Sequence, residues 1–198
     1  MRLLFVRHGE TDWNVENRIQ GGTDTALNET GLEQARQLGQ KLAEQKLMIA
    51  KIYSSKLKRA HKTAEIVGEL LGVDVESVDG LEEMNLGQWE GMRWHEVKET
   101  YPEEYEEWYH NRRYQKTPNG ESYQELLERV LPALTYITQK EENIVLVVTH
   151  SANIVTLLAV IHNTAFDQMF RVYKIGNADV VEIDSTELLK IQLHEEMK

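Results

Sequence analysis

The chain has 198 residues, of which 41% are hydrophobic and 28% charged, and its formal net charge at pH 7 is −11. This length and composition predict a single globular domain over residues 1–198, and the lack of cysteine in the sequence excludes disulfides, thiolate catalysis and zinc–thiolate sites. The acidic balance argues against nucleic acid or an anionic membrane surface as the main partner, and no apolar run is long enough to span a membrane. We therefore expect a cytoplasmic protein, whose oligomeric state the sequence does not indicate.

Apolar periodicity and turn residues divide the chain into alternating strands and helices. Strands are expected at 2–7, 51–54, 73–78 and 143–149, with edge or antiparallel strands at 170–175 and 180–183, and loops at 9–28 and 80–91. Helices are expected at about 29–43, 57–71, 93–111, 121–139 and 152–162, the second of them capped by Ser55 and the third broken at Pro102. This alternation predicts an α/β fold, a three-layer α/β/α sandwich around a mostly parallel sheet.

Two of the expected strands each end in a histidine. The apolar run 3–6 continues into Arg7 and His8, and the run 144–148 continues through a threonine into His150. Ligands of open α/β sheets bind at the carboxyl ends of parallel strands, so neighbouring strands would bring the two histidines to one pocket. An arginine beside them can bind an oxyanion through two parallel hydrogen bonds. The pattern therefore predicts a phosphate site at this edge of the sheet.

Five blocks of sequence, in order along the chain, carry a resemblance to a known family. They are Arg7-His8-Gly9-Glu10-Thr11 with Trp13-Asn14, Arg18 and Gln20-Gly21; Ser54 to Ala60 with Thr63-Ala64; Leu81 to Gly91; Gly120-Glu121-Ser122; and Val148-Thr149-His150. Together they resemble the histidine phosphatase superfamily, which includes the phosphoglycerate mutases, from Arg2 to about Asn153.

The resemblance implies a metal-independent phosphatase that hydrolyses small phosphate monoesters, without a cofactor, through a phosphohistidine. His8 would be the nucleophile, Arg7, Arg59 and His150 would hold the phosphoryl group, and Glu83 would act as acid and base. Further phosphate or substrate contacts would come from Asn14, Arg18, Gln20, Gly21 and Ser151. The sequence contains neither a His-Glu-x-x-His motif nor a calcium-loop spacing, so no metal is expected.

The segment at about 92–118 is acidic and aromatic, and Arg112-Arg113 is its only locally basic part. The resemblance places a small helical cap over the active site here, and we expect this segment to select the substrate. Its tryptophans are expected to pack rather than to bind a cofactor. Ser151 stands where the family commonly has glycine, and its side chain is expected to crowd the phosphate or to alter the orientation of the amide.

Two alternatives compete with the phosphatase. A cofactor-dependent phosphoglycerate mutase shares the histidine chemistry. Mutases have a longer chain, however, with a tyrosine-, arginine- and proline-rich insertion in the cap that this sequence does not reproduce, and Thr11 is more typical of phosphatases. A phosphate-binding protein without catalysis is disfavoured because every principal site position holds the residue type that the family requires. Among possible phosphate esters the sequence favours none.

Overall fold

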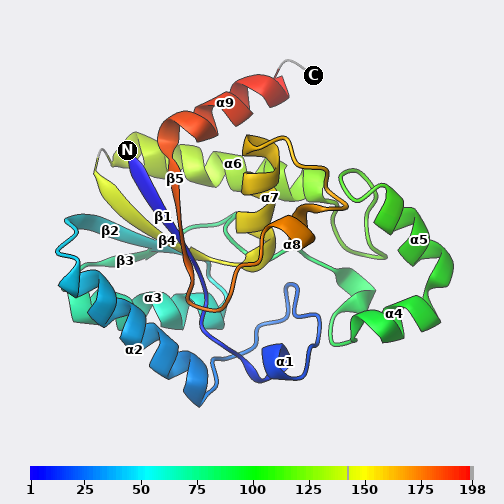
Figure 1. The fold of residues 1–198 in the computed structure, drawn as a ribbon, viewed down its shortest axis with the longest axis horizontal. Coiled ribbons are helices and arrows are strands. Elements are labelled where there is room, and N and C mark those ends of the chain that lie inside the picture. Colours follow the sequence, from blue (N-terminus) through cyan, green and yellow to red (C-terminus); the bar gives the residue numbers. More distant parts are fainter. Residues whose placement is uncertain (142, 197–198) are drawn as a thin grey trace.

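The computed structural model describes residues 1–141 and 143–196, the last five of these by their backbone alone. At its centre is a five-stranded sheet in the order β3-β2-β4-β1-β5 (Figure 1). The strands are β1 (Arg2–Arg7), β2 (Ile49–Ser54), β3 (Val75–Ser77), β4 (Ile144–Thr149) and β5 (Val180–Asp184). The first four are parallel and β5 runs antiparallel to β1, which confirms the predicted mostly parallel sheet.

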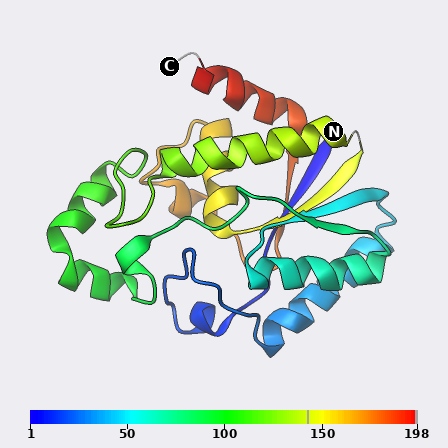
Figure 2. The ribbon, with the colours of Figure 1, turned by 180° about the vertical axis from the view of Figure 1, so that it is seen from behind.

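Helices cover both faces of the sheet, as Figures 1 and 2 show. One layer contains α2 (Glu29–Glu44) and α3 (Lys58–Leu71), and the other contains α6 (Tyr123–Lys140), α7 (Ser151–Ile161) and α9 (Ser185–Glu196). Successive strand residues point to opposite faces, so Leu4 and Val6 join the core beneath α2 and α3 while Leu3 and Phe5 join the core beneath α6 and α7. This confirms the α/β/α sandwich.

Short polar signals set the helix ends. The side chain of Asn28 accepts a hydrogen bond from the Gly31 amide at the start of α2, and Ser122 caps α6 in the same way. Helix α3 ends at Gly72, whose φ of +67° is the left-handed conformation that glycine adopts without strain. The prediction that Ser55 caps α3 was wrong, because the N-cap is Leu57 and the Ser55 hydroxyl accepts a hydrogen bond from the Leu57 amide.

Three local predictions differ from the structure. Residues 170–175 do not form a strand; α8 (Met169–Val172) is a short helix that buries Met169, because β5 already pairs with the β1 edge. The expected loop 9–28 contains the short helix α1 (Asp12–Val15), and α9 was not anticipated.

The segment expected to be a cap forms two helices, α4 (Trp94–Thr100) and α5 (Pro102–His110), which lie to one side of the sheet (Figure 1). Pro102 occupies the first turn of α5, where its missing N–H costs nothing. The rings of Trp94 and Trp108 stack with centroids 5.4 Å apart, and Trp108 meets Trp89 edge-on at 5.3 Å.

None of the helices within residues 1–141 and 143–196 has the length and apolar character that a membrane-spanning helix needs.

Candidate active site

The two histidines lie side by side at the carboxyl edge of the sheet. Strands β1 and β4 pair in parallel, Arg7 opposite Thr149, and the His8 amide donates to the Thr149 carbonyl oxygen at 3.0 Å. The rings of His8 and His150 are both buried, with centroids 5.2 Å apart and planes inclined at 58°. The register of two neighbouring strands therefore fixes their separation.

The His8 ring presents one free nitrogen to the site. Its Nδ1 lies 2.7 Å from the carbonyl oxygen of Gly9, and because a carbonyl oxygen only accepts, Nδ1 carries the proton. Nε2 therefore keeps its lone pair in the neutral ring. Burial, and then the positive charges of Arg59 and Arg7, hold the pKa of His8 well below its usual range. The neutral, nucleophilic form is thus favoured near pH 7.

The His150 ring is held from the opposite side. Its Nε2 lies 2.8 Å from the hydroxyl oxygen of Ser55, and its Nδ1 is buried without a hydrogen-bond partner. Burial, then Arg59 and His8, lower the pKa of His150 well below the usual value. The hydroxyl of Ser55 can donate to Nε2 or accept from it; when it donates, the proton of the neutral ring is on Nδ1, and the unpartnered nitrogen is a hydrogen-bond donor.

Two arginines supply positive charge, Arg59 from a buried position and Arg7 from a half-buried one. Arg7 donates from Nη1 to the Ile175 carbonyl oxygen at 2.6 Å, and Arg59 donates to the carbonyl oxygens of Thr23 and Gly21 at 2.7 and 2.8 Å. The Nε of each is buried without a partner, and within the described part of the chain neither forms an ion pair. Backbone carbonyls orient these guanidinium groups and leave their charge unneutralised, which suits a phosphate site.

Glu83 brings a carboxyl group to the same place. Its Oε1 accepts hydrogen bonds from the amides of Met84 at 2.9 Å and Ala152 at 3.2 Å. Burial raises the pKa of this carboxyl, although the Met84 amide and the positive charges of Arg59, Arg7 and Arg129 oppose the shift. The neighbouring Glu82 turns away, and its Oε2 accepts from the Gly80 amide.

These groups border a cavity of about 400 Å³. Of the residues that the sequence singled out, Arg7, His8, Asn14, Arg18, Gln20, Gly21, Arg59, Glu83 and Ser151 line it, and His150 lies buried beside His8. The remaining wall is largely aromatic or apolar and includes Trp94, Tyr105, Trp108, Tyr123 and Phe170, together with Arg112. The cavity thus has a cationic end around the histidines and a wall that can pack against an organic group.

Most of the sequence also matches a known family. The model of the histidine phosphatase superfamily (branch 1) matches residues 3–190. The chain belongs to the histidine phosphatase superfamily. This confirms the resemblance drawn from the sequence blocks.

The proteins that this chain resembles include relatives named as phosphatases and a solved structure of the same fold. The chain is 38% identical over 157 residues to the uncharacterized phosphatase PhoE of Bacillus subtilis, covering 79% of this chain and 75% of that one. It is 38% identical over 151 residues to a metal-independent phosphoserine phosphatase of Arabidopsis thaliana, covering 75% of this chain and 63% of the relative. The structure of Bacillus stearothermophilus YhfR superposes with a TM-score of 0.82 at 33% identity, over 92% of this chain and 90% of that one. This member of the superfamily is a phosphoric monoester hydrolase, as predicted.

In this histidine phosphatase, the polar residues of the loop 9–28 face the cavity in different ways. The Oδ1 of Asn14 accepts from Thr11 and Asn177, which leaves its amide N–H groups to face a ligand. Arg18 forms an ion pair with Glu16 at 2.6 Å and donates to the Gly91 carbonyl oxygen, so part of its hydrogen-bonding capacity is already used. Gln20 accepts from two threonine hydroxyls, through Oε1.

Gly21 contributes to the site through its backbone, and Ser151 lies on the cavity wall. Gly21 has a φ of +52°, its carbonyl oxygen accepts from Arg59, and a Cβ atom there would clash with the Glu90 carboxylate. Ser151 begins α7 on the cavity wall, and the next amide, that of Ala152, is already bonded to Glu83. A glycine at position 21 is therefore a structural requirement of the site.

Several residues that sequence reasoning missed hold the site together in this histidine phosphatase. Ser55 bonds His150, Thr63 accepts from the Gly9 amide at 3.0 Å, and Asn177 donates to the His8 carbonyl oxygen at 3.0 Å. Ser55 follows β2, the next strand to β4, so the argument that paired the two histidines applies to it as well. Thr63 and Asn177 had no such signal, because one lies within a helix and the other in an irregular connection.

Proposed function

We propose that His8 is the nucleophile of this phosphatase. Nε2 attacks the phosphorus of a bound monoester, a P–N bond forms, and the bond between phosphorus and the ester oxygen breaks. The departing oxygen takes the proton that the buried Glu83 carboxyl carries, so the alcohol leaves neutral. The observation that supports this most directly is the His8 ring itself, whose Nδ1 is fixed on a backbone carbonyl and whose Nε2 is free beside the cavity.

The second step regenerates the enzyme. A water molecule gives a proton to the Glu83 carboxylate and attacks phosphorus, the P–N bond breaks, and inorganic phosphate leaves. Glu83 is then protonated and His8 neutral, as at the start. The raised pKa of Glu83 suits a group that must hold a proton in one step and accept one in the next.

Charge on the transferring phosphoryl group is balanced by fixed donors. We assign Arg7, Arg59 and Nδ1 of His150 to the phosphoryl oxygens, with the amide of Asn14 as a neutral donor. The carbonyl oxygen of Gly21 holds Arg59. The rest of the substrate occupies space that is bordered by Arg18, Gln20 and Ser151. Because the arginines are oriented by backbone carbonyls before substrate binds, little reorganisation is needed in the transition state.

Residues 92–118 act in this proposal as a cap that selects the substrate. The guanidinium of Arg112 lies 4.4 Å from the Trp108 ring centroid, its buried Nε has no hydrogen-bond partner, and it has no ion pair with any described residue. An unpaired cation on the wall of the cavity favours a small ester that carries a second anionic group, such as a carboxylate. The phosphoserine phosphatase among its relatives is consistent with this choice. That the enzyme works in the cytoplasm stays a prediction of the sequence.

Trapping the intermediate tests the mechanism. With a chelator present, the enzyme should hydrolyse p-nitrophenyl phosphate, and peptide mass spectrometry after an alkaline quench should find phosphate on His8. His8→Ala should remove the label and lower kcat/KM by more than about 10³-fold. A label on another residue, or turnover that survives in the variant, contradicts the proposal. Transfer of the label to a second sugar or glycerate hydroxyl rather than to water would indicate a mutase.

A further inference from the structure

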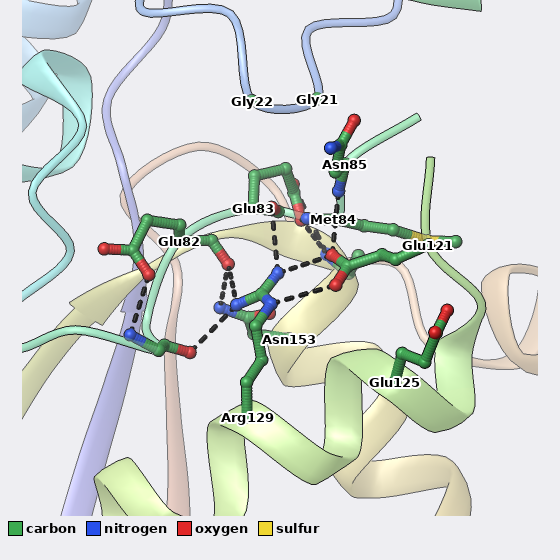
Figure 3. A network of polar contacts seen from close by, with 12 residues as sticks. Gly21, Gly22, Glu82, Glu83, Met84, Asn85, Glu121, Glu125, Arg129 and Asn153 are labelled. Atoms are coloured by element: carbon green, nitrogen blue, oxygen red, sulfur yellow. Dashed lines mark hydrogen bonds and ion pairs between the residues drawn. The ribbon is translucent and has the colours of Figure 1, made fainter. Parts of the chain in front are cut away.

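Helix α6 holds the loop that carries Glu83. From this helix the guanidinium of Arg129 reaches into the loop, where Nη1 donates to the carbonyl oxygens of Gly80 at 2.9 Å and Glu82 at 2.8 Å, and Nη2 donates to that of Glu83 at 2.9 Å. Figure 3 shows these contacts converging on one side chain. One arginine thus binds the backbone at the acid/base position and at two residues before it.

Glu121 completes the contact from the start of the same helix. Its two carboxylate oxygens accept from Nε of Arg129 at 3.0 Å and from Nη2 at 2.6 Å, and Oε1 also accepts from the Asn85 amide at 2.8 Å (Figure 3). The two side chains are only 27% and 14% exposed. A bidentate pair with this little exposure is more rigid than a surface ion pair, so Arg129 is fixed in orientation.

The glycine before Glu121 allows the close approach. A Cβ atom on Gly120 would lie 2.5 Å from the Asn85 carbonyl oxygen, and the Glu121 amide donates to that same oxygen at 2.9 Å. Ser122 then caps α6. The Gly120-Glu121-Ser122 block therefore joins the Glu83 loop to the helix that carries Arg129. The catalytic scheme assigns no other role to this block.

A separate contact supports the same loop from α7. Nδ2 of Asn153 donates to the carbonyl oxygen of Leu81 at 2.8 Å. It also donates to the carbonyl oxygen of Glu82, which lies 3.0 Å away; Glu82 and Asn153 are both labelled in Figure 3. The carboxyl of Glu83 itself is held by two amides, those of Met84 and Ala152. Its position in the cavity therefore depends on where the loop backbone lies.

We propose that Arg129 and Glu121 are positioning residues, which act through Glu83 by holding its carboxyl where the leaving oxygen departs. This rests on the proposed role of Glu83 as acid and base. Neither side chain lines the cavity, so neither touches the substrate. A displacement of about 1 Å at a reacting group can cost about 10²-fold in rate, so a loosened loop weakens proton transfer while phosphate binding persists.

The leaving group provides the test. An alkyl phosphate needs a proton from Glu83 as its alkoxide departs, whereas 2,4-dinitrophenyl phosphate releases a stable phenolate and needs little help. Arg129→Lys and Glu121→Gln should each lower kcat/KM for the alkyl ester by about 10- to 100-fold, and that for the dinitrophenyl ester by less than about threefold. Because kcat/KM reports phosphoenzyme formation, the later attack of water does not enter the comparison.

Two controls make the result specific. Arg2→Lys alters a similar bidentate pair, between Arg2 on β1 and Glu182 on the edge strand β5, and should leave both esters unaffected. The double variant Glu83→Gln/Arg129→Lys should be no slower on the alkyl ester than Glu83→Gln alone, since both changes remove one function. Thermal melting of each variant separates unfolding from misplacement, and Glu121→Gln provides the measurement if Arg129→Lys does not fold.

The outcomes separate this proposal from the one on which it rests. Equal losses on both esters in Arg129→Lys and Glu121→Gln, or additive losses in the double variant, overturn the positioning role. If Glu83→Gln itself affects both esters equally, the acid role of Glu83 is wrong. In the remaining outcome, Glu83→Gln slows the alkyl ester more than the dinitrophenyl ester while Arg129→Lys and Glu121→Gln do not. That result contradicts only the positioning role of Arg129 and Glu121 and leaves the acid role of Glu83 intact.

Discussion

The hydroxyl of Ser55 lies 2.8 Å from Nε2 of His150, and this contact decides which nitrogen of the ring faces the phosphate site. The two residues follow adjacent strands, β2 and β4, and both side chains are fully buried. Because Ser55 occupies Nε2, the unpartnered Nδ1 is the atom that can meet a phosphoryl oxygen. A small side chain outside the substrate cavity thereby sets the direction of the donor nitrogen of His150.

Ser55→Ala should therefore lower kcat/KM by roughly tenfold, the effect of one lost hydrogen bond in a buried site. The ring of His150 loses the partner that fixes its tautomer, while His8 is unchanged and phosphohistidine still forms. Steady-state kinetics on p-nitrophenyl phosphate measure the loss. Ser54→Ala is the matched control, because Ser54 is equally buried but bonds to His61 and Ser77 instead. An unchanged kcat/KM in Ser55→Ala would remove this role.

Arg112→Met should change substrate preference more than basal activity. We expect kcat/KM for O-phosphoserine to fall about tenfold or more, and that for O-phosphoethanolamine, which lacks only the carboxylate, to change less than about twofold. The physical reason is that the unpaired guanidinium of Arg112 is the cation available on the cap side of the cavity. Competition kinetics with both esters in one reaction measure the ratio directly.

The neighbouring arginine serves as the control for that experiment. The guanidinium of Arg113 donates to Gln124 at 3.0 Å and lies over the Phe166 ring rather than lining the cavity. Arg113→Met should therefore leave the ratio of the two esters unchanged. If the two variants shift the ratio equally, or if Arg112→Met lowers both esters alike, the second anionic group does not bind at Arg112.

Acid should destabilise the fold through the buried histidines. Burial and the nearby arginines depress the pKa of His8 and His150 below the ordinary value of 6.5, so the unfolded chain binds more protons. Their stabilising contribution is present above pH 6.5 and is lost as pH falls below it. The raised pKa of Glu83 acts with the opposite sign, since its contribution is lost as pH rises.

Urea unfolding at pH 7.5 and 5.5 measures this effect. The free energy of unfolding should fall by roughly 2–3 kcal/mol between the two values, and by about half as much in His150→Gln, which has no proton to gain. The surface variant His110→Gln is the control, because that side chain is 74% exposed. Equal unfolding midpoints for the unmodified protein at both pH values would contradict the prediction.

The sequence by itself determined the two central buried strands and the end of each strand at which the polar site residues lie. The runs before Arg7 and before Thr149 are apolar and β-rich, which describes strands buried on both faces, and their carboxyl ends are the ligand edge in any parallel sheet. It also indicated the break at Pro102, because proline is disfavoured in a helix interior, although Pro132 lies within α6. These are local properties, so local patterns suffice to predict them.

Only the tertiary structure decided the contacts between distant segments. Ser55 and His150 are 95 positions apart, and Arg129 and Glu83 are 46 apart. The error at 170–175 has the same origin, since that segment is apolar enough for a strand but β5 occupies the sheet edge. A residue's partner is set by strand order and helix packing, which periodicity within one segment does not encode. The residues of the phosphate site could therefore be identified from the sequence, whereas the groups that orient them could be identified only from the folded structure.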